Sequence, residues 1–125
     1  MKQEIIIEET KHTPVVYFER EKRLLVMRGR SIPENPEQIF RRLDEWITLH
    51  FEKNEELSIN IQLEYINSGS SKYLYEILKK LTVYGRTGKI IKIKWRYEED
   101  DEAMLELGEH YRDTAGIPLE IEMIV

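Results

Sequence analysis

Three segments of the chain alternate almost perfectly between apolar and polar side chains, and this feature constrains the fold more than any other. The segments are residues 57–66, 89–98 and 119–125. Because successive side chains of a strand point to opposite faces, each segment predicts a strand with one apolar and one polar face. A strand covered by helices on both faces reads instead as a continuous apolar run. The pattern therefore excludes a sheet enclosed between two helical layers.

Helical patterns separate these strands. Apolar residues recur every three or four positions from Ile39 to His50, from Leu74 to Leu81 and from Met104 to Ala115. Strands that are joined by helical crossovers pair mostly in parallel. We therefore predict an α/β fold of two layers, with a mixed, mostly parallel sheet and three helices packed mainly on one face. The other face of the sheet is expected to be mostly solvated.

The N-terminal part of the chain predicts a hairpin followed by the first helix. Residues 13–20 and 23–30 are rich in residues that favour strands and are separated by two charged residues, which indicates an antiparallel pair. Asn35 is a good N-cap, Pro36 suits the first helical position, and Gln38 stands where a capping-box partner belongs.

Composition bounds the class of protein. The 125 residues are 41% hydrophobic and carry a formal net charge of −5, which suits one core in a single domain spanning residues 1–125. There is no cysteine, so disulfides, thiolate nucleophiles and cysteine-based metal sites are excluded. Apolar runs are far shorter than the ~20 residues that cross a bilayer, and no signal-peptide pattern is present. We predict a cytoplasmic protein without a membrane partner.

A basic stripe on one predicted strand is the only pattern that suggests nucleic-acid binding. Lys92, Lys94 and Arg96 alternate with Trp95 and Tyr97, so the aromatic rings lie on the opposite face and cannot stack on a base held by the basic residues. The acidic net charge also opposes a general electrostatic attraction to nucleic acid. We predict that the stripe is a solvated face whose charges pair with acidic residues of a neighbouring strand.

Residues that could support catalysis or bind a metal are scattered. His12, His50 and His110 fall in three different elements, and no nucleophile-elbow, P-loop or dinucleotide-binding motif is present. The acidic run at residues 98–102 lacks the spacing and internal glycine of a calcium loop. It is better interpreted as the first turn of a helix capped by Asp100 or Asp101. We predict no catalytic residue, no metal site and no cofactor.

The turn from Asn67 to Lys72 places three serine hydroxyls between the end of a strand and the start of a helix. Ser70 or Ser71 is expected to cap the helix, which leaves Ser68 upstream on the loop. A phosphate on Ser68 would lie near unpaired helix amides, which can hold an anion without unfolding the domain. From the residues alone, regulation by phosphorylation and an ordinary capping turn both remain open.

Three segments of the chain resemble the SiaC family of bacterial regulatory phosphoproteins, small proteins with a STAS-like fold similar to that of anti-sigma-factor antagonists. The segments are Thr13-Pro14 with residues 29–35, residues 63–72 (LEYINSGSSK) and residues 95–102 (WRYEEDDE). The middle segment is the most specific, because it resembles the family pattern Tyr-(Phe/Leu)-Asn-Thr-Ser-Ser-X-Lys. The resemblance spans nearly the whole chain.

The resemblance implies a phosphorylation cycle. Ser68 stands where the family usually has a threonine that accepts a phosphate. In the family, a dedicated Ser/Thr protein kinase adds this phosphate and a metal-dependent phosphatase removes it. The unphosphorylated form of the family binds a diguanylate cyclase and promotes its activity in c-di-GMP signalling and biofilm control. Gly69 stands where serine is common in the family, and it is expected to make the loop more flexible.

We therefore predict a non-enzymatic, partner-switching protein whose binding is controlled by reversible phosphorylation at Ser68, with Ser70 and Ser71 as alternative acceptors. The expected contact surface consists of Asn67, Ser68, Gly69, Lys72, Tyr73 and Lys79. Two other functions are compatible with the sequence. One is a constitutive interaction or scaffold domain, and the other is a STAS-like sensor with an apolar pocket for a small molecule under residues 67–71.

Overall fold

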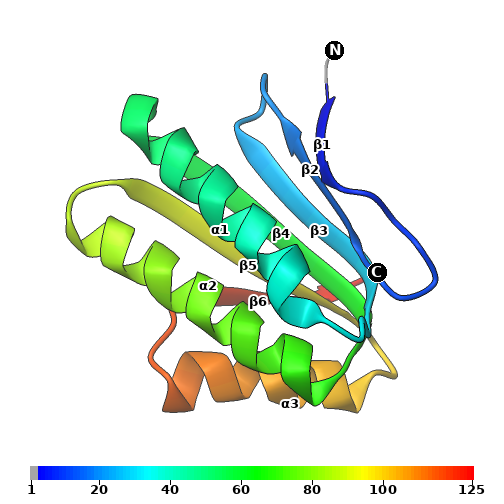
Figure 1. Ribbon diagram of the computed structural model, residues 1–125. Coiled ribbons are helices and arrows are strands. Elements are labelled where there is room, and N and C mark those ends of the chain that lie inside the picture. The colour runs from blue at the N-terminus through cyan, green and yellow to red at the C-terminus, as the bar shows by residue number, and fades with distance from the viewer. Residues whose placement is uncertain (1–2) are drawn as a thin grey trace.

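The computed structural model describes residues 3–125 as one six-stranded sheet with three α-helices packed on the same face (Figure 1). The strands are β1 (Gln3–Ile7), β2 (Val15–Glu19), β3 (Leu24–Ser31), β4 (Glu56–Ile66), β5 (Ile90–Glu98) and β6 (Leu119–Ile124). The helices are α1 (Pro36–Lys53), α2 (Ser68–Arg86) and α3 (Glu102–Glu109), and α3 continues into a π-helical turn, η1 (His110–Thr114).

The order of the strands in the sheet follows the chain, from β1 at one edge to β6 at the other. Strands β1, β2 and β3 pair antiparallel, whereas β3, β4, β5 and β6 pair in parallel. Each helical crossover moves one strand farther along the sheet in the same direction, and crossovers of the same hand then leave their helices on one face. The predicted two-layer α/β fold and the antiparallel hairpin are confirmed.

Strand β1 and the outer face beside it differ from the prediction. The five residues of β1 do not alternate, and the strand is added to the edge of the hairpin. On the outer face Ile5 lies opposite Tyr17, which in turn lies opposite Val26. Tyr17 and Val26 are each only 8% exposed. The outer face is therefore less solvated than predicted around Tyr17 and Val26, although Arg28 and Arg30 of the same face are exposed.

Over β4, β5 and β6 the outer face carries the predicted pairs of opposite charge. The Nε atom of Arg96 donates to Oε1 of Glu122 at 2.9 Å, and Nζ of Lys94 lies 3.6 Å from Oε2 of the same carboxylate. Arg96 also donates to the side-chain oxygen of Gln62 on β4 at 3.2 Å. The basic stripe thus lies between two polar strands, which confirms its interpretation as a solvated, charge-paired face.

Helix α1 begins at Pro36 as predicted, but the side chain of Asn35 makes no capping hydrogen bond. Near the other end of the helix, His50 is buried and its ring stacks on Trp46 at a centroid distance of 4.9 Å. The His50 Nε2 atom lies 2.9 Å from the carbonyl oxygen of Glu56. Burial lowers the pKa of His50. The environment of His50 is that of a core histidine, as expected from its lone position on the helix.

The acidic run caps α3 as predicted, and Asp101 is the residue that does so. Its Oδ1 atom accepts a hydrogen bond from the backbone N–H of Met104 at 3.1 Å. The predicted stripe to Ala115 faces the core, but the helix widens into η1 after Glu109. This turn buries Tyr111, which is 3% exposed and lies edge-on against Trp95. Inserted π turns are frequent near functional sites.

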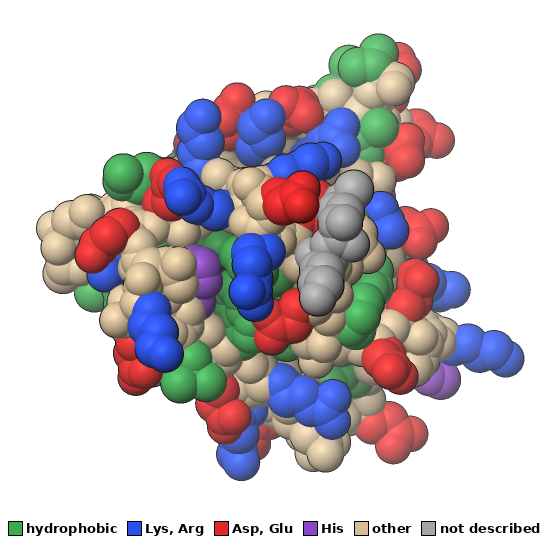
Figure 2. Space-filling model, turned by 90° about the horizontal axis from the view of Figure 1, so that it is seen from above, with side chains coloured by type: hydrophobic (Ala, Val, Ile, Leu, Met, Phe, Trp, Pro, Cys, Tyr) green, Lys and Arg blue, Asp and Glu red, His purple; other side chains and the backbone are tan. Residues whose placement is uncertain are grey.

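No helix in residues 3–125 combines the length and the apolar character that crossing a bilayer requires. Figure 2 shows the end of the molecule where β1 begins, and there acidic and basic side chains of the described chain are interspersed instead of separated by sign. That end therefore presents no broad basic field of the kind that binds nucleic acid without sequence preference.

Candidate functional site

Asn67 holds the turn between β4 and α2. Its Oδ1 atom accepts a hydrogen bond from the backbone N–H of Ser70 at 2.9 Å, and its Nδ2 atom donates to the carbonyl of Pro33 at 3.3 Å. The backbone N–H of Asn67 also donates to the carbonyl of Ser31 at 3.0 Å. The prediction that Ser70 or Ser71 caps the helix is therefore wrong. Asparagine takes the position because it can cap α2 and bind a neighbouring loop at the same time.

Ser68 is the first residue of α2 and not, as predicted, a loop residue upstream of the helix. Its side chain is exposed, and its hydroxyl has no hydrogen-bond partner within residues 3–125. The first N–H groups of a helix have no acceptor within the helix, and the helix dipole makes this end partially positive. A negative charge added to Ser68 would therefore be compatible with the helix.

The hydroxyls of Ser70 and Ser71 already form hydrogen bonds within the fold. Ser70 is 0% exposed, and its Oγ atom lies 3.0 Å from Oγ of Ser31 in the core. The hydroxyl of Tyr111 donates to the carbonyl of Ser71 at 2.8 Å and therefore accepts from the Ser71 hydroxyl at 2.9 Å. The prediction that Ser70 is an alternative phosphoacceptor is wrong for the folded chain, because its hydroxyl is inaccessible. Ser71 could accept a phosphate only by breaking its bond with Tyr111, a phenol whose pKa burial raises.

Gly69 lies in the first turn of α2, where it faces the first residue of α1. A Cβ atom at this position would lie 3.3 Å from Cγ of Pro36, closer than an ordinary van der Waals contact. The glycine therefore lets the N-terminal ends of α1 and α2 approach each other. The expectation of a more flexible loop is wrong, because Gly69 is helical and lies between a capping residue and a buried serine.

An open cleft of about 550 Å³ lies beside Ser68, at the C-terminal end of β4 and the N-terminal ends of α2 and α3. Its charged lining residues are Glu64 and Asp101, and no Lys or Arg of residues 3–125 lines it. Met104 and Leu107 supply apolar surface from α3. The lining of the cleft thus combines apolar and acidic side chains.

Tyr65 lines the same cleft and is 58% exposed, whereas the alternation of β4 predicts it in the core. The register between β3 and β4 shifts at this point, so that Gly29 lies opposite Leu63 but Arg30 lies opposite Tyr65. A bulge of this kind reverses the alternation of a strand. The ring of Tyr65 consequently lies 5.9 Å from the guanidinium carbon of Arg30 instead of in the core.

The exposed face of α2 continues the surface that begins at Ser68. We call this surface the α2 stripe, and it consists of the exposed residues Ser68, Lys72, Lys79 and Val83 together with the half-buried Tyr75. The Nζ atom of Lys79 lies 5.4 Å from the ring centroid of Tyr75, and Val83 is 50% exposed. The spacing of these residues by three or four positions places them on one side of a helix. That spacing is a signal from which Tyr75 and Val83 could have been predicted.

The structure brings together most of the predicted contact residues. Asn67, Ser68 and Gly69 form the start of α2, and Lys72 follows one turn later. Tyr73 is separated from them, because its ring is half-buried and stacks on Phe40 of α1 at a centroid distance of 6.1 Å. Within residues 3–125, no group of three or more His, Asp and Glu residues is placed to hold a metal ion.

The model of the SiaC family of regulatory phosphoproteins matches residues 7–124. An uncharacterized protein of Pseudomonas aeruginosa strain UCBPP-PA14 is 27% identical over 114 residues, which cover 90% of each chain.

Two solved structures from Pseudomonas aeruginosa have the same fold. One is the crystal structure of the diguanylate cyclase SiaD in complex with its activator SiaC. The matching chain in it is 27% identical with a TM-score of 0.85, and the match covers 94% of this chain and 98% of that chain. The other is SiaC of the same organism, with a TM-score of 0.85 and 26% identity over 99% of this chain and 100% of that one.

Proposed function

Because this chain belongs to the SiaC family of regulatory phosphoproteins, we propose that it is a partner-switching protein controlled by reversible phosphorylation of Ser68. In the proposed cycle a Ser/Thr protein kinase adds the phosphate and a metal-dependent phosphatase removes it. The unphosphorylated form binds a diguanylate cyclase. The chain itself supplies a binding surface and carries out no reaction.

The accessibility of the three serines in the turn is the observation that carries this proposal. Ser68 is exposed and its hydroxyl has no partner within the described residues, whereas Ser70 is buried and Ser71 is bonded to Tyr111. A kinase needs an accessible hydroxyl that can be modified without breaking the fold. Among these three serines, Ser68 alone meets both conditions.

Charge supplies the mechanism of the switch. A phosphoserine carries nearly two negative charges near neutral pH, and on Ser68 it would adjoin a cleft already lined by Glu64 and Asp101. A partner seated on the cleft would have to desolvate or pair this dianion, and an unpaired buried charge costs several kcal/mol. Phosphorylation is therefore expected to release the partner. The fold should survive, because negative charge at a helix N-terminus is mildly stabilising.

The nature of the partner is inferred from the relative. SiaC of Pseudomonas aeruginosa is the activator of the diguanylate cyclase SiaD, which supports a diguanylate cyclase as the partner here and a role in c-di-GMP signalling and biofilm control. The cleft and the α2 stripe suit a protein partner, because an exposed aromatic ring such as that of Tyr65 is a typical anchor of an interface. A cyclase domain that consumes GTP works in the cytoplasm, so the proposed role places this chain there.

The test compares three forms of the full chain in binding to a diguanylate cyclase of its own host. They are the unmodified protein, the protein phosphorylated at Ser68, and Ser68→Ala. The unmodified and Ser68→Ala forms should bind equally, because Asn67 caps α2 and alanine is uncharged. The phosphorylated form should bind at least tenfold more weakly, equivalent to about 1.4 kcal/mol.

A matched control identifies the acceptor. Phosphate transfer by the host kinase should be abolished in Ser68→Ala and retained in Ser71→Ala, as read from intact mass and peptide mapping. Phosphate that maps to Ser71 would contradict the assignment of Ser68. Equal binding of the cyclase by all three forms would instead support a constitutive scaffold.

A further inference from the structure

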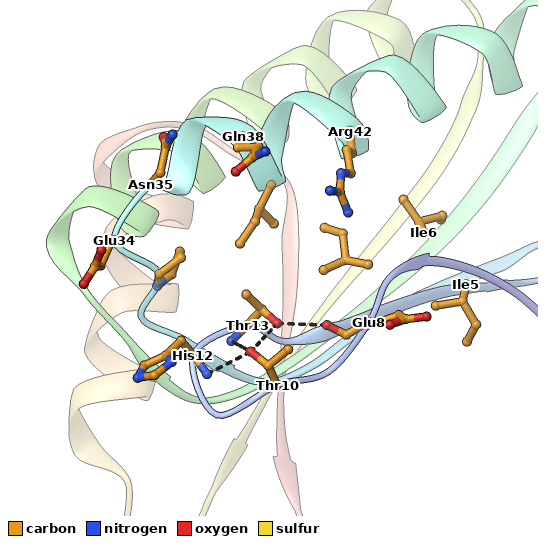
Figure 3. A pocket seen from close by; sticks show the side chains of 13 residues that line it. Ile5, Ile6, Glu8, Thr10, His12, Thr13, Glu34, Asn35, Gln38 and Arg42 are labelled. Atoms are coloured by element: carbon orange, nitrogen blue, oxygen red, sulfur yellow. Dashed lines mark hydrogen bonds between the residues drawn. The ribbon is translucent and has the colours of Figure 1, made fainter.

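A second cavity, of about 760 Å³, lies between the start of α1, strand β1 and the loop that joins β1 to β2 (Figure 3). It shares no lining residue with the cleft beside Ser68. Its volume is within the range of roughly 300–1,000 Å³ that is usual for sites that bind small molecules. The proposed phosphorylation cycle does not use it.

The loop that forms one wall of the cavity is held in place by its own hydrogen bonds. The hydroxyl of Thr13 donates to the carbonyl of Glu8 at 2.8 Å, and the hydroxyls of Thr10 and Thr13 lie 2.8 Å apart. The backbone N–H groups of His12 and Thr13 donate to the Thr10 hydroxyl at 3.1 and 3.0 Å. Figure 3 shows these bonds gathered at the floor of the cavity. The wall is therefore formed before any ligand arrives, which lowers the entropic cost of binding.

The interior of the cavity is partly apolar. Ile6 and Ile39 are half-buried and pack against the core, and Ile7 is 2% exposed. Pro33 extends this surface. A ligand that fills the space must therefore have an aliphatic part, since burying apolar surface supplies the main driving force for binding.

Two polar side chains of α1 reach this apolar surface from above. Gln38 and Arg42 are four residues apart and line the cavity, and Figure 3 shows the Arg42 guanidinium directed from the helix toward β1 and its loop. Within residues 3–125 Arg42 has no carboxylate within 4.0 Å, whereas its neighbour Arg41 is paired with Glu37. A guanidinium presents a planar fork of donors that fits a carboxylate with two parallel hydrogen bonds.

The remaining charged side chains limit the charge of the anion. Glu8, Glu34 and His12 also line the cavity, and in Figure 3 the Glu34 carboxylate points away from Arg42. Two carboxylates around one guanidinium leave no excess positive charge, so nucleotides and other polyanions are disfavoured. A ligand with a single negative charge can pair with Arg42 and meets less repulsion from the two glutamates than a polyanion does.

We propose that this cavity binds small aliphatic monocarboxylates, with the carboxylate on Arg42 and Gln38 and the aliphatic chain over Ile6, Ile39 and Pro33. The site adds a ligand-binding function to the chain and stands whether or not Ser68 is phosphorylated.

Sodium hexanoate is a suitable probe, titrated into the full chain while backbone amide signals are followed by NMR. For a ligand of this size we expect a dissociation constant of about 1 mM, from the usual affinity per non-hydrogen atom. Saturable shifts should be confined to residues 5–13 and the first turns of α1. Hexylamine, which has the same chain with a positive head group, should bind at least tenfold more weakly.

Adjacent arginines provide matched variants. Arg42→Gln should weaken hexanoate binding at least tenfold, and Arg41→Gln should leave it unchanged, because Arg41 does not line the cavity. Both positions are exposed on α1, so unchanged thermal melting curves will show that the variants fold. The proposal is overturned if hexanoate causes no saturable shift in this region at tens of millimolar. It is also overturned if hexylamine binds equally well, or if Arg42→Gln binds like the unmodified chain.

Discussion

Replacing Asn67 tests the physical basis of the turn that presents Ser68. In Asn67→Ala, α2 loses the oxygen that accepts from the Ser70 N–H, and the Pro33 carbonyl loses its donor. The affected N–H belongs to a residue that is 0% exposed, so water cannot easily replace the lost acceptor.

The expected magnitude follows from these two bonds. Loss of an N-cap side chain costs about 1 kcal/mol and at most about 2 kcal/mol. The bond to Pro33 is longer, at 3.3 Å, and contributes at the lower end of the usual range, about 0.5 kcal/mol. Asn67→Ala should therefore lower the free energy of unfolding by about 1.5–2.5 kcal/mol. Asn67→Asp keeps the capping acceptor and gains from the helix dipole, so it should lose less than about 1 kcal/mol.

Equilibrium unfolding in urea measures both variants on the full chain. A loss of about 2 kcal/mol should move the midpoint of unfolding by about 1 M, with an unchanged slope. A midpoint for Asn67→Ala within about 0.2 M of the unmodified protein would refute the argument that Asn67 holds the turn. Equal losses in the alanine and aspartate variants would show instead that the bond to Pro33, and not the cap, is the important one.

Three further predictions concern the sheet and the core. The double change Lys92→Ser with Lys94→Ser should lower the free energy of unfolding in urea by less than about 1 kcal/mol, because the ion pair of Lys94 is more than a third exposed; a larger loss would mean that this face is covered. Ser31→Ala should lower the free energy of unfolding by about 1–3 kcal/mol, because it leaves the buried hydroxyl of Ser70 without its partner. Changing both serines should cost less than the sum of the single changes, and additive losses in a double-mutant cycle would contradict the pairing. Burial lowers the pKa of His50, so the unfolded chain binds a proton at a higher pH than the folded chain does, near the ordinary pKa of about 6.5. The free energy of unfolding should therefore fall as the pH drops from that value to the lower pKa of the folded state. His50→Gln should lose this part of the pH dependence, and identical pH profiles of the two proteins would refute the expectation.

The fold could be predicted from the sequence where the local pattern and the tertiary structure agree. Alternation identified β4, β5 and β6, because each has one face toward the helices and one toward solvent. Strand β1 could not be predicted, since its five residues do not alternate and the strand is defined by pairing with β2. The outward turn of Tyr65 also depends on a neighbour, because the bulge that causes it is a property of the β3–β4 pair.

The candidate site could be located from the sequence, but its internal arrangement could not. Asn67, Ser70 and Ser71 are all good capping residues, so local preference does not choose among them. The choice is made by distant partners, since Pro33 engages Asn67, Ser31 engages Ser70 and Tyr111 engages Ser71. The chemistry of Ser68 is thus decided by what its neighbours bind elsewhere in the chain.

The hydroxyls of Ser70 and Ser71 are engaged in hydrogen bonds, which limits how many phosphates the proposed switch can carry. One accessible serine admits one phosphate per molecule at this turn, so each molecule has two states and no graded intermediate. The signal is then the fraction of molecules in each state, which the opposing rates of kinase and phosphatase set. Any sharp threshold in the response must arise from competition between those two enzymes or from the amount of partner, and not from counting phosphates along the chain.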